Sequence, residues 1–229
     1  MLILFDIDAT LITTKGVGIA AMIDAGRRLH GPGFHAEGIE FAGRLDPLIL
    51  RDMLCANGLA CSTEAMIAMR HAYRDALVRR LAPGGVARSL PGVLELLASL
   101  GTLDDRVTLG LLTGNFSETG SLKLQAAGID PQGFPVRVWG DESPHEPPAR
   151  EHLPGIAIER VAQRWGRPCR GEEVVVIGDT PHDIACARAH GCRVLAVATG
   201  KFSAAELAHA DRVVPDLSDV EGVQRWLTG

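Results

Sequence analysis

Short apolar runs alternate with helical patterns from residue 90 to the C-terminus, and this alternation constrains the fold more than any other feature of the sequence. Strands that alternate with helices form a parallel sheet that is covered on both faces. The clearest run lies at residues 174–177, where Val and Ile form a continuous pattern typical of a buried strand. The sequence therefore predicts an α/β fold with a Rossmann-like parallel sheet.

The same reasoning places the remaining elements of the sheet and its covering helices. A first strand and the turn after it are expected at residues 2–10, and further strands at residues 107–112, 136–139, 193–198 and 213–214. Helices between and after these strands are expected at residues 91–100, 117–127, 152–165, 181–190, 204–209 and 220–227.

Residues 13–88 interrupt this pattern just after the first strand, because Ala, Met, Leu and Arg dominate there and β-branched runs are few. Asp46 and Pro47 are typical of an N-cap and a first helical position. Helices are expected at residues 18–30, 48–56 and 62–82. We expect an α/β core domain and an inserted small α-helical cap domain that is well placed to act as a lid. Their predicted bounds are residues 1–14 and 89–229 for the core and 15–88 for the cap.

Bulk composition excludes several classes of protein. The formal net charge is −5 and the pI is about 5.9, without a basic stripe, which argues against a nucleic-acid or anionic-membrane surface. No apolar run approaches the length of a membrane span and no signal peptide is recognised, so a cytoplasmic protein is expected. The five cysteines form no C-x-x-C pair, and we expect buried free thiols. Oligomeric state is left open.

Acidic and hydroxyl side chains follow three of the predicted strands at the point where each strand ends. Asp6 and Asp8 follow the first strand, Thr113 follows the second, and Asp179 and Asp183 follow the strand at residues 174–177. Because the carboxyl ends of parallel strands lie at one edge of the sheet, these side chains should converge. Asp6, Asp179 and Asp183 then offer oxygen ligands of the kind that Mg²⁺ prefers. Each acid alone has an ordinary alternative as a turn or helix-start residue, but their corresponding positions favour a site.

These motifs resemble those of the haloacid dehalogenase-like (HAD) phosphohydrolase superfamily, in its small helical cap branch, over nearly the whole chain. The segments that carry the resemblance are Asp6-x-Asp8-x-Thr10, Thr113 after an apolar strand, and Gly178-Asp179-x-x-x-Asp183. Within that branch the chain is most similar to phosphoglycolate phosphatase-like members. The segments behind this narrower similarity are Gly43-Arg44-Leu45-Asp46, Leu112-Thr113-Gly114-Asn115-Phe116 and Lys123-Leu124.

The resemblance implies a division of labour between the two first acids. Asp6 would attack phosphorus and form a phosphoaspartate, and Asp8 would act as general acid and base while its backbone carbonyl ligates the metal. Mg²⁺ would be held by Asp6 and Asp179, with Asp183 supporting. Family members that dehalogenate carbon lack an acid at the second position, so Asp8 favours phosphoryl transfer.

The resemblance also assigns the groups that hold the phosphate. The Thr113 hydroxyl and the backbone N–H groups of Ile7, Gly114 and Asn115 would bind the oxygens of the transferring phosphoryl group. Arg44, in the presumed lid, either reaches an anionic group of the substrate or lies on the surface.

Two positions depart from the family pattern. Ala9 stands where Asp-Gly-Thr is usual, so a turn that needs a positive φ there would be strained. The lysine that neutralises phosphate is missing, since residues 131–178 contain no lysine. Arg150 is the preferred replacement, because arginine can bind phosphate through two donors, and Lys123 is the alternative.

The sequence therefore predicts an enzyme, a hydrolase of phosphoric monoesters that uses Mg²⁺ and acts on a small phosphorylated metabolite, similar to phosphoglycolate phosphatases. A phosphomutase with the same site is the nearest alternative. A non-catalytic scaffold that binds phosphorylated metabolites or a protein partner is the second, and it is suggested by Ala9 and by the missing lysine.

Overall fold

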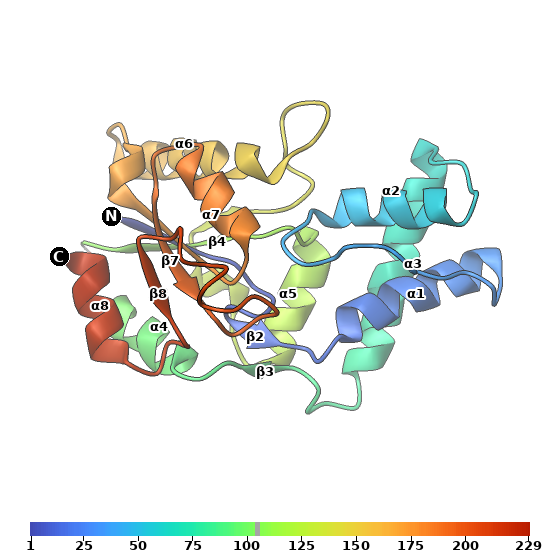
Figure 1. Cartoon of the computed structure of the whole chain (residues 1–229), viewed down its shortest axis with the longest axis horizontal. Coiled ribbons are helices and arrows are strands. Elements are labelled where there is room, and N and C mark those ends of the chain that lie inside the picture. The colour runs from blue at the N-terminus through green and yellow to red at the C-terminus, as the bar shows by residue number, and fades with distance from the viewer. Residues whose placement is uncertain (104–105) are drawn as a thin grey trace.

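A six-stranded parallel sheet forms the centre of the protein in a computed structural model that describes residues 1–103 and 106–229 (Figure 1). The strand order is β5-β4-β1-β6-β7-β8. The strands are β1 (Leu2–Phe5), β4 (Thr108–Leu112), β5 (Val136–Val138), β6 (Val174–Gly178), β7 (Arg193–Val197) and β8 (Arg212–Val214). The predicted α/β fold with a parallel sheet is confirmed.

Strand β1 occupies the middle of the sheet because all four of its side chains are apolar and fully buried. It pairs in parallel with β4 on one side and with β6 on the other, and Phe5 lies opposite Leu111 and Ile177. Successive side chains of a strand point to opposite faces. Accordingly Phe5 packs into one hydrophobic core while Leu4 packs into another. This register brings the carboxyl ends of the three strands to the same edge of the sheet.

Helices cover both faces of the sheet, and each face has its own core (Figure 1). The helices that contribute to the first core are α4 (Val93–Gly101), α5 (Ser117–Ala126) and α8 (Val220–Thr228). Those that contribute to the second are α6 (Leu153–Trp165) and α7 (Pro181–Arg188). The alternation of strands and helices along the sequence thus produces three layers, with the sheet between two layers of helices.

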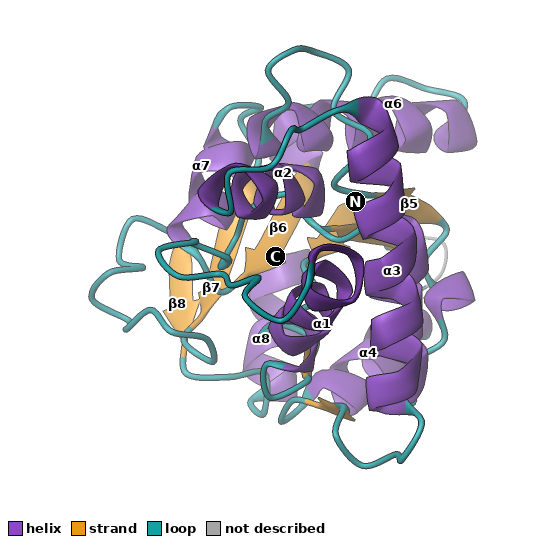
Figure 2. Cartoon of the chain, turned by 90° about the vertical axis from the view of Figure 1, so that its right-hand side faces the viewer, coloured by secondary structure: helices purple, strands orange, loops and turns teal. Residues whose placement is uncertain are grey.

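The segment after the first strand forms three helices that stand beyond the edge of the sheet, in front of the strands in Figure 2. They are α1 (Val17–His30), α2 (Asp46–Ala56) and α3 (Thr63–Leu81). They share a third hydrophobic core, to which Met22, Met53 and Met69 contribute. The methionines of this segment therefore serve packing. The division of the chain into two domains at residues 14/15 and 88/89 stays a prediction.

A short antiparallel pair of strands lies where the chain leaves the sheet for the inserted helices and where it returns. It consists of β2 (Ile12–Thr13) and β3 (Arg88–Ser89), with Ile12 opposite Ser89. Two-residue strands are too short to produce a periodic pattern, which is why the sequence did not predict them.

Three local predictions are wrong. Residues 204–209 form turns instead of a helix, since only Leu207 of that segment is buried and nothing packs a second turn. Asp46 is the first residue of α2 and Leu45 is its N-cap, because the Asp46 side chain is bonded elsewhere. The cysteines are free thiols but not all buried: two are buried, Cys169 is intermediate, and Cys55 and Cys61 are exposed. Among the helices of the described residues, none is long and apolar enough to cross a membrane.

Candidate active site

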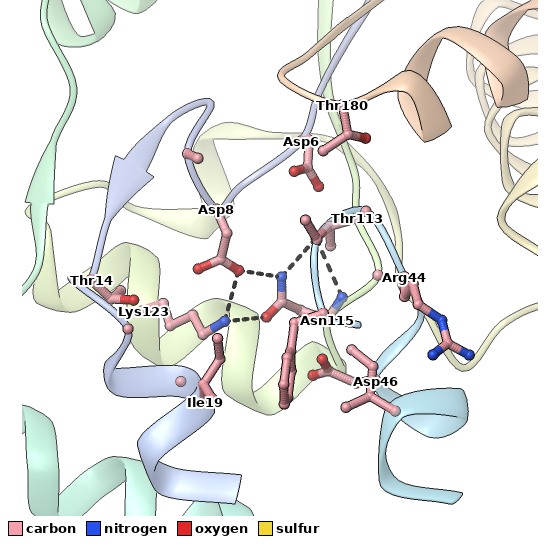
Figure 3. A pocket seen from close by; sticks show the side chains of 18 of the residues that line it. Asp6, Asp8, Thr14, Ile19, Arg44, Asp46, Thr113, Asn115, Lys123 and Thr180 are labelled. Carbon is pink, nitrogen blue, oxygen red and sulfur yellow. Dashed lines mark hydrogen bonds and ion pairs between the residues drawn. The ribbon is translucent and has the colours of Figure 1, made fainter. Parts of the chain in front are cut away.

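A cavity of about 470 Å³ lies between the carboxyl edge of the sheet and the inserted helices (Figure 3). The sheet side contributes Asp6, Thr113 and Asp179, and the insertion contributes Gly18 and Tyr73. Of the five side chains that the sequence predicted to converge, those of Asp6, Asp8, Thr113 and Asp179 line the cavity, and the three-helix segment closes its other side.

Three carboxylates meet at the sheet side of this cavity. Asp6, Asp179 and Asp183 are buried, and one oxygen from each lies within 4.8 Å of the others. Burial, together with the charges of its two neighbours, raises the pKa of Asp179 to about 8 and also raises the pKa of Asp6. The structure thus brings the predicted metal-binding side chains together, in surroundings that disfavour several negative charges at once.

Arg150 is the cation that lies in this acidic cluster. Its Nη2 donates to Asp6 Oδ1 at 3.0 Å and to Asp183 Oδ1 at 2.5 Å, while Nη1 donates to the Gly43 carbonyl at 3.3 Å. The side chain is 5% exposed, and it starts from a short 3₁₀ turn before α6. Of the two cations that the sequence offered in place of the family lysine, Arg150 is the one beside Asp6.

Asp183 holds Arg150 in place instead of offering free oxygens. Its Oδ2 accepts hydrogen bonds from the backbone N–H of Thr180 at 3.0 Å and from the Thr180 hydroxyl at 2.7 Å, and its Oδ1 accepts from Arg150. Thr180 in turn caps the start of α7, as the order Thr-Pro-x-Asp predicts. Gly178 permits this packing, because a Cβ there would lie 2.2 Å from Asp183 Cγ.

These residues suit a divalent cation. Asp179 Oδ1 accepts one long bond from the Thr10 hydroxyl at 3.3 Å, and Asp6 gives one oxygen to Arg150. Three carboxylates therefore lie near one guanidinium, and burial together with the negative charge that remains explains the raised pKa of Asp179. A hard cation bound by Asp6 and Asp179 would compensate it with oxygen ligands of the expected type.

Asp8 forms a separate group with Asn115, which follows β4, and with Lys123 of α5 (Figure 3). Its Oδ2 accepts from Lys123 Nζ at 2.7 Å and from Asn115 Nδ2 at 2.9 Å, and Lys123 Nζ also donates to Asn115 Oδ1 at 2.6 Å. Burial lowers the pKa of the Lys123 ammonium, but the carboxylates of Asp8 and Asp46 outweigh it and hold the pKa above its usual value. Lys123 thus orients Asp8 and does not lie beside Asp6.

The segment after β4 supplies a hydroxyl and a close backbone contact. The Thr113 hydroxyl accepts from the Asn115 backbone N–H at 3.3 Å and from Asn115 Nδ2 at 2.8 Å. A Cβ on Gly114 would lie 2.0 Å from the Arg44 carbonyl oxygen, so only glycine lets the insertion approach here. The Gly114 carbonyl accepts from the Asp46 backbone N–H at 2.7 Å.

The turn after β1 has the strained backbone that the sequence predicted. Ala9 has a φ of 59°, in the left-handed region that costs a non-glycine residue about 1 kcal/mol. The Ala9 N–H donates to the Ile12 carbonyl at 2.8 Å, and the Thr199 hydroxyl donates to the Ala9 carbonyl. The Ile7 carbonyl accepts from the N–H groups of Leu11 and Ile12, which completes the turn. These bonds hold the loop between Asp6 and Asp8 in one shape.

The Arg44 side chain points away from the acidic cluster (Figure 3). Its Nη2 donates to Asp52 Oδ2 at 2.6 Å, and Nη1 donates to the Glu40 carbonyl at 3.4 Å. The backbone of Arg44 lines the cavity, but of the two alternatives for its guanidinium the structure favours the one outside the site.

Sequence reasoning missed two buried polar residues of the cavity wall. Asp46 Oδ2 accepts from the Phe116 N–H at 3.2 Å and from the Thr119 hydroxyl at 3.4 Å, and burial raises its pKa to about 7. Tyr73 is fully buried, and its hydroxyl has no hydrogen-bond partner among the described residues. The sequence signal that could have identified Tyr73 as a site residue was its hydroxyl on an otherwise apolar helix face. Asp46 gave no such signal, because an acid before proline is already explained as a helix start.

Comparison with known proteins agrees with this fold. The model of a HAD-hydrolase-like family matches residues 153–220. A hydrolase from Pseudomonas syringae is 22% identical with a TM-score of 0.73, over 100% of this chain and 99% of that chain. No curated protein matches the chain.

Two further solved structures are similar over almost their whole length. A predicted phosphoglycolate phosphatase from Haemophilus somnus is 18% identical with a TM-score of 0.69, over 97% of each chain. A β-phosphoglucomutase from Clostridium difficile is 17% identical with a TM-score of 0.70, over 98% of this chain and 95% of that one. The resemblance to the HAD superfamily that the motifs suggested is thereby confirmed, and the fold is HAD-like.

Proposed function

We propose that the protein is a magnesium-dependent phosphatase that hydrolyses a small phosphorylated metabolite through a phosphoaspartate on Asp6. The observation that carries this proposal is the arrangement around Asp6, where Arg150 and two further acids form one group and Asp8 forms a second with Lys123 and Asn115. Phosphate esters hydrolyse very slowly unaided, so a positioned nucleophile and charge compensation are both needed.

Charge compensation at the nucleophile comes first from Arg150. Two anions approach each other when a carboxylate attacks a phosphate ester, and a buried guanidinium in contact with Asp6 reduces their repulsion. Asp6, Asp179 and the backbone carbonyl of Asp8 would hold Mg²⁺, with Asp183 supporting, and the bound ion would supply further positive charge to the phosphoryl oxygens. The Thr113 hydroxyl and the N–H groups of Ile7, Gly114 and Asn115 would bind those oxygens.

Asp8 would act as the general acid and then as the general base. Lys123 and Asn115 hold its Oδ2, so the carboxyl is fixed in orientation and its other oxygen is left for the ester oxygen of the leaving group. It would protonate that oxygen in the first step and then take a proton from the water that attacks the phosphoaspartate.

The cavity volume and the structural relatives suggest the kind of substrate. About 470 Å³ accommodates a small metabolite rather than a polymer. The similarity to a predicted phosphoglycolate phosphatase supports a phosphatase, with phosphoglycolate as one candidate substrate that a comparison of matched esters tests. The similarity to a β-phosphoglucomutase keeps a phosphomutase as the second candidate, because the same site would return the phosphoryl group to the substrate.

The test is turnover of p-nitrophenyl phosphate by the purified full-length chain with and without Mg²⁺. We expect phosphate release that requires Mg²⁺ and is abolished in Asp6→Asn. Asp130→Asn is the matched control, since Asp130 is exposed, does not line the cavity, and its amide would still accept the bond from the Gln132 N–H. With a panel of sugar phosphates as substrates, an isomerised product without free phosphate would support the phosphomutase. Metal binding without turnover of a broad ester panel would support the scaffold and refute the proposal.

A further inference from the structure

The deep end of the cavity contains polar atoms that the proposed chemistry does not use. Tyr73 Oη is fully buried, has no partner among the described residues, and faces the cavity wall. A Cβ placed on Gly18 would lie 3.7 Å from Tyr73 Oη and 3.1 Å from Lys123 Nζ. Gly18, Tyr73 and Lys123 all line the cavity, so the two donors border one space, and Gly18 lets the backbone of α1 come close to them. Lys123 Nζ already donates to Asp8 and Asn115, whereas Tyr73 Oη has no partner among the described residues. A buried hydroxyl without a partner is costly, which suggests a ligand atom there.

An acceptor borders the same space. Asp46 gives its Oδ2 to the Phe116 N–H and the Thr119 hydroxyl. Asp46 lines the same cavity as Lys123 and Tyr73, so it belongs to the same polar group, and its charge also raises the pKa of both. Donors and an acceptor together fit a group that both accepts and donates a hydrogen bond, which is the property of a hydroxyl.

The local charge favours a ligand hydroxyl over a ligand carboxylate at this position. Lys123 supplies one positive charge, but Asp8 already pairs with it at 2.7 Å and Asp46 adds a second carboxyl group. An anionic group placed there would meet at least as much negative as positive charge and would lose its hydration. A neutral hydroxyl has no such penalty.

We propose that Gly18, Tyr73, Lys123 and Asp46 form a subsite for a hydroxyl on the leaving group, so that the substrate is the phosphate ester of a small polyol or sugar. This rests on the proposed function, because it places the phosphate at Asp6 and the rest of the substrate toward the insertion. Tyr73 and Gly18 are then specificity-determining residues, and neither takes part in the chemical step.

Three esters of the same size test the subsite: ethyl phosphate, 2-hydroxyethyl phosphate and phosphoglycolate, which differ only in a terminal methyl, hydroxymethyl or carboxylate. Binding to the Asp6→Asn protein with Mg²⁺ is measured by calorimetry, so the readout does not depend on turnover. One buried hydrogen bond should make 2-hydroxyethyl phosphate bind about three- to tenfold more tightly than ethyl phosphate. Phosphoglycolate should bind more weakly than 2-hydroxyethyl phosphate.

Adding Tyr73→Phe to the Asp6→Asn protein should bring the ratio of the dissociation constants for ethyl phosphate and 2-hydroxyethyl phosphate close to one. The reason is that the substitution removes only the hydroxyl. Ser99→Ala is the matched control, since it also removes one hydroxyl, bonded to Gln224 far from the cavity, and should keep the ratio. Equal binding of ethyl and 2-hydroxyethyl phosphate, tighter binding of phosphoglycolate, or an unchanged ratio in Tyr73→Phe would overturn the subsite. Failure of the phosphatase proposal is seen separately, as absent turnover of p-nitrophenyl phosphate.

A different observation points to a modification site on the outer face of the insertion. Cys55, near the end of α2, and Cys61, just before α3, are both exposed, and their Sγ atoms are 2.8 Å apart. Two accessible thiols in contact are positioned for oxidation to a disulfide, since the second step is intramolecular.

We infer that Cys55 and Cys61 form a reversible disulfide when a peroxide is present. One thiol attacks the peroxide oxygen and becomes a sulfenic acid as the first water leaves. The second thiol then displaces the sulfenic oxygen as a second water, so that two thiols and one peroxide yield one disulfide and two waters. The peroxide is reduced and both sulfurs are oxidised.

Hydrogen peroxide treatment followed by alkylation and peptide mapping tests this inference. We expect one peptide pair linked through Cys55 and Cys61, a mass lower by two hydrogen atoms, and full reversal by dithiothreitol. Cys61→Ser should lose the link, whereas Cys169→Ser should keep it. Alkylation of both thiols after peroxide treatment, or a link that includes Cys169, would overturn the inference.

Discussion

Replacement of Arg150 by methionine is the most informative perturbation of this structure. Methionine keeps much of the aliphatic volume but removes the guanidinium that contacts Asp6, Asp183 and the Gly43 carbonyl. The two carboxyl groups are 6% and 0% exposed, so neither can recover its hydration by a side-chain rotation. The variant therefore isolates the electrostatic contribution of one buried cation.

Removal of one partner from a buried ion pair costs about 3–5 kcal/mol, because the other charge stays buried without compensation. Two carboxylates lose their partner here, so we expect the free energy of unfolding to fall by at least about 3 kcal/mol at neutral pH without Mg²⁺. Without the guanidinium, the folded-state pKa of Asp6, which burial already raises, lies further above its unfolded value. Groups with a raised folded-state pKa stabilise the fold below the unfolded pKa and lose that contribution as pH rises. The loss of unfolding free energy in Arg150→Met should therefore grow as pH rises.

Urea unfolding followed by circular dichroism measures this deficit at several pH values, with and without Mg²⁺. Mg²⁺ should restore part of the lost stability if the acidic cluster binds it, because it replaces positive charge at the same place. Arg79→Met, at an exposed position of α3, is the matched control and should change the free energy of unfolding by less than about 0.5 kcal/mol. A deficit below about 1 kcal/mol, or one that grows as pH falls, would refute the placement of Arg150 among buried carboxylates.

Three other perturbations follow from the same geometry. Ala9→Gly should raise the free energy of unfolding by about 1 kcal/mol in urea, because glycine adopts the positive φ without strain; a destabilised variant would contradict the backbone assignment. In wild type without Mg²⁺, the raised pKa of Asp179 should reduce stability as pH rises from about 4 to about 8, and Asp179→Asn should remove that part of the dependence; identical pH profiles would be inconsistent with its burial. Gly114→Ala should lower the kcat/KM for p-nitrophenyl phosphate and cost about 1–3 kcal/mol of stability, because its Cβ would displace the Arg44 carbonyl; an unchanged variant would show that the insertion does not approach this loop.

The sheet could be predicted because its signal is local. Residues 2–5 and 174–177 are continuous apolar runs, and burial on both faces of a parallel sheet produces that pattern. The order of polar residues after these strands then placed Asp6 and Asp179 at one edge by geometry alone. Ala9 illustrates how far a resemblance extends: the family turn has glycine there, which implied strain for alanine if the turn needs a positive φ, and the φ of Ala9 is indeed positive.

The partners of each side chain could not be predicted, because they come from distant parts of the chain. Asp8 and Lys123 are 115 positions apart, and no periodicity links them. The choice between Arg150 and Lys123 as the cation beside Asp6 depended on where each side chain lies in the assembled protein, since Arg150 contacts Asp6 and Lys123 contacts Asp8. Tyr73 followed an ordinary packing pattern, and only the assembled cavity revealed a hydroxyl without a partner.

The bonds of Arg150 also bear on how the site could open. Its two charged contacts are to Asp6 and Asp183 of the sheet edge, whereas its contact to the insertion is one neutral bond to the Gly43 carbonyl. Withdrawal of the insertion would break that weak bond, worth about 1 kcal/mol, and leave the ion pairs intact. The nucleophile would then keep its electrostatic environment while substrate enters and product departs, so each catalytic cycle could begin from a centre that is already assembled.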